Sequence, residues 1–74
     1  MNKQSKSLIK QVRKAIQSSR DELEKAFDLE QDAFDDLPES KQMNEAGEAR
    51  EAKLNDMMMI MGDLDAIASD LGAF

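Results

Sequence analysis

The sequence predicts an all-α protein: a two-helix antiparallel hairpin of the coiled-coil type that assembles with further copies into a multi-helix bundle. Three observations lead to this prediction. The strong helix formers Ala, Glu, Lys, Leu, Met, Gln and Arg dominate the 74-residue chain. Apolar residues recur at alternating spacings of three and four, which is the period of a helix that packs along one side on another helix. The single proline, Pro38, stands near the middle, where a chain that folds back must reverse.

The first helix is expected over about residues 6–36. Its apolar stripe begins at Ile9 and continues over four heptads. Phe27 and Phe34 lie seven residues apart beside this stripe and widen it toward the turn. The residues expected to form the seam of the hairpin are Ile9, Val12, Ile16, Leu23, Ala26, Phe27, Ala33 and Phe34 of the first helix, together with Leu54 of the second.

The turn is expected at residues 37–44, because a proline disfavours helical geometry in the residue before it. Pro38 itself is suited to open a short turn of helix. Asn44 is a good N-cap, so the second helix is expected over residues 45–71, with Gly72 directly after it. Two helices of nearly equal length with a short connection pack antiparallel, and together they make one domain of residues 1–74.

A band of five consecutive apolar residues, Met57 to Met61, is more than a hairpin requires. Five such residues cover most of the circumference of a helix, and one partner helix covers only part of it. We therefore expect a surface for further copies of the chain. The alternative is a loosely packed core with some methionines tolerated at the surface. The residues predicted for the oligomer interface are Met57, Met58, Met59, Ile60, Met61, Leu64, Leu71 and Phe74.

Charge is unevenly distributed along the chain. Residues 1–20 carry six basic side chains and no acid, whereas residues 21–74 carry all 16 acids and four bases. In an antiparallel hairpin the basic segment lies beside Asp63, Asp65 and Asp70, and this pairing is one explanation. The other is that a nucleotide or nucleic acid binds to the basic segment. The candidate anion contacts are Lys6, Lys10, Arg13 and Lys14.

The region around the turn is strongly acidic. From Asp28, the acids fit several positions of a calcium-binding loop, but Ala33 stands where that loop requires glycine. A solvated helix face is the simpler interpretation. A further hypothesis is that the acidic surface imitates nucleic acid and inhibits a basic partner protein.

The residue types present favour a protein that is not an enzyme. The chain has no cysteine and no histidine, and no serine has an evident activating partner. We therefore predict no catalytic residue, no metal and no cofactor. The sequence also has no apolar segment of membrane-spanning length, so we expect no membrane contact and a cytoplasmic location.

The turn carries a short motif, Leu-Pro-Glu-Ser-x-Gln over residues 37–42, followed by Glu-x-Gly-Glu over residues 45–48. With the acids before it, this pattern resembles uncharacterised small helical-hairpin proteins of bacteria and prophages. The likeness covers about residues 24–56 and departs from the family pattern at Asp36, Lys41 and Ala46. It implies a helical hairpin and a phage or mobile-element setting, in which small helical proteins commonly bind a host protein.

Overall fold

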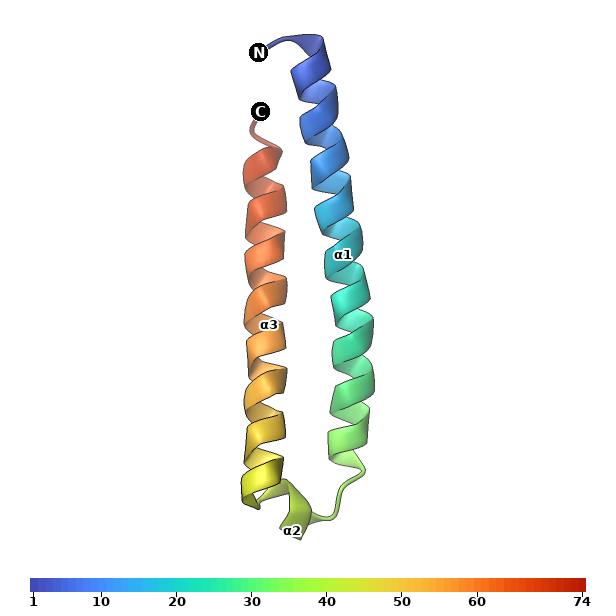
Figure 1. Ribbon diagram of the computed structural model, residues 1–74, viewed down its shortest axis with the longest axis vertical. Coiled ribbons are helices and arrows are strands. Elements are labelled where there is room, and N and C mark those ends of the chain that lie inside the picture. Colours follow the sequence, from blue (N-terminus) through green and yellow to red (C-terminus); the bar gives the residue numbers. More distant parts are fainter.

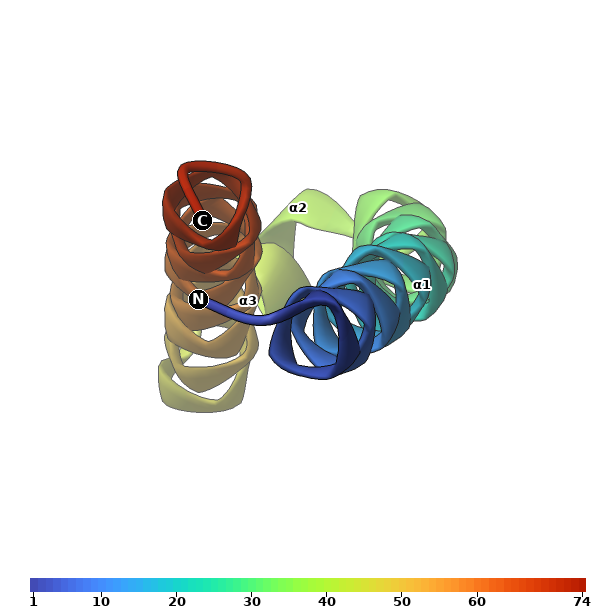
Figure 2. The same cartoon turned by 90° about the horizontal axis from the view of Figure 1, so that it is seen from above.

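The computed structural model describes residues 1–74 as three helices and no strand: α1 (Lys3–Asp35), α2 (Glu39–Gln42) and α3 (Glu45–Leu71). The molecule is a rod of 58 × 15 × 12 Å, in which α1 and α3 run antiparallel and both termini lie at the end away from α2 (Figure 1). Seen along the rod, α1 and α3 are inclined to each other (Figure 2). The prediction of an all-helical chain is therefore confirmed. No helix has the length and hydropathy needed to cross a membrane.

Asparagine side chains set the beginnings of both long helices. The Asn2 side chain accepts a hydrogen bond from the Ser5 N–H at 2.7 Å, and Asn44 accepts one from the Gly47 N–H at 2.8 Å. Each bond satisfies a backbone donor that has no partner within the helix. The cap at Asn2 explains why α1 begins three residues before the predicted start, while α3 has the predicted bounds.

The turn is held by backbone contacts that the residue pattern did not predict. The Gln42 side-chain amide donates to the carbonyl oxygens of Phe34 at 3.1 Å and Leu37 at 3.0 Å, and so satisfies acceptors at the end of α1. Gly47 is buried, and a Cβ atom there would overlap the carbonyl oxygens of Lys41 and Gln42. Glycine is therefore required where α3 passes the short helix α2.

The core is a single row along α3. Its four buried residues are seven apart: Gly47, Leu54, Met61 and Ala68. A second, half-buried row consists of Arg50, Met57, Leu64 and Leu71. These two rows together have the spacing of three and four that is typical of a helix–helix seam.

The face that α1 turns toward α3 differs from the predicted seam. Ile9, Ile16, Leu23, Phe27 and Phe34 are half-buried there, and α1 has no fully buried residue. Arg13 and Arg20 are also half-buried, because they share the heptad row of Phe27 and Phe34.

Val12, Ala26 and Ala33 are exposed and lie outside this face, which corrects their predicted place in the seam. The physical reason is the size of the competing side chains. Burying two phenylalanines removes more apolar surface from water than burying two alanines, so α1 is rotated to bring the row of Phe27 and Phe34 toward α3.

Candidate protein-interaction face

The hairpin leaves a row of apolar side chains uncovered on each long helix. In α1 these residues form two groups, over residues 8–15 and 26–33, in which neighbours are three or four residues apart, and the polar residues Ser19 and Glu22 occupy the row between the groups. In α3 the residues are seven apart. We call the combined surface the open face. It consists of Leu8, Val12, Ala15, Ala26, Leu29 and Ala33 of α1, with Ile60 and Ile67 of α3. Leu29 has an exposed fraction of 72 % and Ile67 one of 47 %, so both side chains remain accessible when α1 and α3 pack on each other.

Both rows lie on the same side of the hairpin, as the contacts of Arg20 demonstrate. The Arg20 guanidinium forms ion pairs with Glu24 of α1 and Asp65 of α3, which identifies one side of the helix pair. Because an α-helix has 3.6 residues per turn, the side chains of Ile60 and Asp65 project from α3 on opposite sides of the buried row. The Val12 side chain likewise projects from α1 on the side of the seam opposite Glu24. A helix pair has two open sides, so Val12 and Ile60 share the second one.

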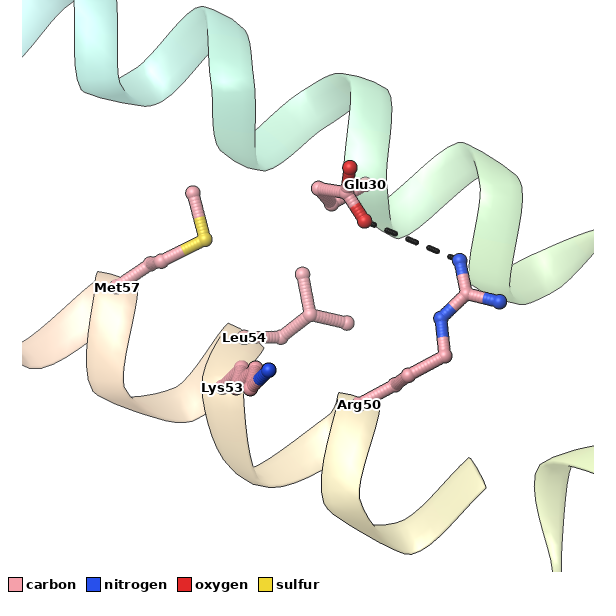
Figure 3. Close-up of a pocket in the computed structure, with 5 residues that line it drawn as sticks. All are labelled: Glu30, Arg50, Lys53, Leu54 and Met57. Carbon is pink, nitrogen blue, oxygen red and sulfur yellow. Dashed lines mark ion pairs between the residues drawn. The ribbon is translucent and has the colours of Figure 1, made fainter. Parts of the chain in front are cut away.

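Near the turn, α1 and α3 form an open pocket lined by Glu30, Arg50, Lys53, Leu54 and Met57 (Figure 3). Leu54 and Met57 point toward α1, and Arg50 Nη2 lies 3.8 Å from Glu30 Oε2. Lys53 lies seven residues before Ile60, so this pocket continues the α3 row of the open face toward the turn.

The five apolar residues 57–61 point in four directions. Met61 is buried in the seam and Met57 is half-buried beside it, because they are four residues apart. Ile60 belongs to the open face. Met58 is exposed on the side of the hairpin where Asp65 lies. Met59 projects from the surface of α3 that faces away from α1, and its exposed fraction is 68 %.

The other predicted interface residues also separate. Leu64 and Leu71 are half-buried in the second row of the seam. Phe74 follows the end of α3 and is exposed beside a shallow groove that Lys6 and Ile9 also line. The sequence interpretation thus missed α1 as part of the exposed surface. The available signal was the regular spacing of Leu8, Ala15 and Leu29, which follows the same heptads as Val12 and Ala26.

Arg20 is the best-connected charged residue. Its Nε atom lies 3.2 Å from Asp65 Oδ1, but this N–H is buried without a hydrogen-bond partner. Partial desolvation acts to lower the pKa of Arg20, while the negative charges of Asp65, Glu24 and Asp21 outweigh it and raise that pKa. The guanidinium therefore stays charged and links the two helices on the side away from the open face.

Three of the four candidate anion contacts, Lys6, Lys10 and Arg13, line one groove at the open end, and Lys14 lies outside it. The Arg13 Nε donates to the carbonyl oxygen of Ala68 at 3.0 Å, so this side chain serves the hairpin. Lys6 and Lys10 line the shallow groove at the open end, and Lys14 is exposed. No acidic side chain lies within 4.0 Å of these three lysines. No group of three metal-ligand side chains lies close enough together to hold an ion.

No protein-family model, curated protein or solved structure matches this chain. The likeness of the turn to bacterial and prophage hairpin proteins therefore stays a prediction. The candidate site rests on the geometry of the open face.

Proposed function

We propose that this protein is a non-enzymatic protein–protein interaction module that associates with further copies of itself through the open face. The observation that carries the proposal is the row of exposed aliphatic side chains that α1 and α3 present on one side. A contiguous apolar surface on a small protein usually marks an interaction site.

The surface area supports this proposal. The chain exposes 5732 Å². A compact monomer of 8.3 kDa exposes about 4,600 Å². The difference of roughly 1,100 Å² is similar to the area of about 800 Å² that each partner contributes to a stable interface.

The small core supports it as well. Only three hydrophobic side chains, those of Leu54, Met61 and Ala68, are buried in the hairpin. Chains of this length bury too little surface for a large stability margin and commonly need disulfides, metals or oligomerisation. There is no cysteine to form a disulfide. Association with another copy supplies the missing burial.

Sedimentation velocity at micromolar concentration tests the proposal. We expect the wild type to sediment as an oligomer of the 8.3 kDa chain. Ile60→Glu/Ile67→Glu is expected to weaken association about 100-fold or more, because it buries unpaired carboxylates in the interface. Both residues are exposed in the single hairpin, so circular dichroism should still report helix at concentrations where the variant is monomeric.

The matched control is Met58→Glu/Met59→Glu, which adds the same two charges on the other exposed surfaces of α3. We expect this control to associate like the wild type. A monomeric wild type would reject self-association. Dissociation by the methionine variant alone would move the interface from the open face to the methionine surface.

A second candidate function is the binding of a nucleotide or nucleic acid, and it rests on Lys6, Lys10 and Lys14, which have no ion-pair partner. Its signature is binding that weakens steeply with salt. The variant Lys10→Ala/Lys14→Ala should then lose a labelled oligonucleotide and keep its oligomeric state. If a host protein is the partner instead, as a phage setting implies, the Ile60→Glu/Ile67→Glu variant should lose that protein.

A further inference from the structure

Resting on the proposed self-association, we propose that two hairpins pack open face to open face in an antiparallel dimer, with their turns at opposite ends of a four-helix bundle. The two-fold axis is perpendicular to the helices. In this arrangement α1 packs on α1 of the second copy, and α3 packs on α3. Two observations support this arrangement. The turn half and the open half of the hairpin differ in net charge, and the apolar rows of α1 and α3 can both be paired about the same two-fold axis.

The charge of the hairpin differs between its ends. The turn half, residues 21–53, carries 12 acidic and four basic side chains, a net charge of −8. The open half, residues 1–20 and 54–74, carries four acidic and six basic side chains, a net charge of +2. Packed helices lie about 8–10 Å apart, within the Debye length of about 10 Å at 0.1 M salt. An antiparallel dimer places each −8 half on a +2 half, whereas a parallel dimer places the two −8 halves together.

The row on α1 is complementary to itself when reversed. Its residues pair about a point between Arg20 and Asp21, so that each apolar side chain meets another apolar one, and Ser19 meets Glu22 at the centre. The pairs are Leu8 with Ala33, Val12 with Leu29, and Ala15 with Ala26. A surface that meets its own copy in this way forms an isologous interface, as a two-fold axis requires.

The row on α3 has the same axis. Within one hairpin Arg20 contacts Asp65, Arg13 contacts the carbonyl oxygen of Ala68, and Glu30 contacts Arg50, so the midpoint between residues 20 and 21 lies level with about residues 60–65 of α3. The midpoint between Ile60 and Ile67 is residues 63–64. One two-fold axis therefore places Ile60 of one copy on Ile67 of the other while it pairs the α1 rows. The axis also brings the two copies of Asp63 near each other and Asp56 of each copy near Asp70 of the other, and these repulsions fall at exposed positions.

A parallel dimer uses the same surface less well. Its two-fold axis lies along the helices and packs α1 on α3 of the second copy. The six apolar residues of the α1 row then meet only Ile60 and Ile67, and Asp56 and Asp63 lie along the same edge of α3. In the parallel dimer, Ala15 of one copy lies near Ile67 of the other, whereas in the antiparallel dimer Ala15 lies near Ala26. Each arrangement therefore has a pair of residues that is close only in that arrangement.

Disulfide formation between single-cysteine chains separates the two arrangements, and the chain has no cysteine of its own. Chains carrying Ala15→Cys and Ala26→Cys are mixed, unfolded, refolded together and held in a glutathione redox buffer. We expect a disulfide-linked dimer in the mixture and in neither variant alone. In the antiparallel dimer two copies of residue 15 are about 16 Å apart at 1.5 Å per residue, beyond the Cα separation of about 7 Å that a disulfide spans.

The control mixture is Met59→Cys with Ala26→Cys, which should give no dimer above background. A link between Ala15→Cys and Ile67→Cys chains, without one between residues 15 and 26, would overturn the antiparallel arrangement and assign the parallel one. Failure of both links in a chain that sediments as an oligomer would overturn the arrangement and leave the proposed function standing. A monomeric wild type would overturn both.

Discussion

The turn end and the open end of the hairpin are held together by different kinds of contact. At the turn end, the Gln42 amide bonds to the carbonyl oxygens of Phe34 and Leu37, and Gly47 lies against the backbone of α2. These contacts join groups of fixed geometry that are close in sequence. The turn end is therefore completed within a single chain.

At the open end, the two helices are joined only through side chains. Arg13 donates to the carbonyl oxygen of Ala68, and Ile9 and Leu71 are half-buried. Leu8, Val12 and other aliphatic side chains remain exposed along the same helices. The comparison indicates that the turn defines the hairpin, whereas the rest of the rod leaves aliphatic side chains uncovered.

Gly47→Ala should have the largest effect on the turn end. The new methyl group meets two backbone oxygens that cannot move away, so we expect a loss of about 2–4 kcal/mol in the free energy of unfolding. At fixed protein concentration this lowers Tm by at least about 10 °C. Thermal unfolding followed by circular dichroism measures it.

The matched control for this substitution is Gly62→Ala. Nothing lies within 4 Å of a Cβ at this glycine. Alanine should therefore stabilise α3 by about 0.5–1 kcal/mol through its higher helix propensity. Equal effects of the two substitutions would contradict the close approach at Gly47.

Gln42→Ala should have an intermediate effect. It removes the hydrogen bonds from the Gln42 amide to the carbonyl oxygens of Phe34, Asp35 and Leu37, at a cost of about 1–2 kcal/mol in the free energy of unfolding. Lys41→Ala, at the exposed neighbouring position, should stay within about 0.5 kcal/mol of the wild type. Urea unfolding at one protein concentration compares them, and a neutral Gln42→Ala would show that the turn does not depend on this side chain.

Arg20→Gln should have the smallest effect, because the ion pair with Asp65 is partly exposed and lacks a well-directed hydrogen bond. We expect a decrease in Tm smaller than that of Gln42→Ala. The difference from the wild type should shrink in 1 M salt, where the Debye length is about 3 Å. A decrease that is unchanged by salt would assign the role of Arg20 to packing of its aliphatic stem.

Much of the fold was predictable from local signals. Pro38 and Asn44 mark the turn and the start of α3 through preferences that act within a few residues. The contacts of Gln42 and Gly47 were not predictable, because they depend on the path of the chain between the two long helices. For the site, the expectation of uncovered apolar surface came from Met57 to Met61, but the direction of each side chain required the position of α1.

The sequence alone therefore determined two long helices, their reversal at Pro38 and an excess of apolar surface, since helix propensity and periodicity are properties of short segments. Only the tertiary structure decided which stripe of α1 packs on α3. Both candidate stripes contain Ile9, Ile16 and Leu23 and have the same period, so spacing does not separate them. The bulk of Phe27 and Phe34 selects one, and Val12, Ala26 and Ala33 of the other are left on the open face.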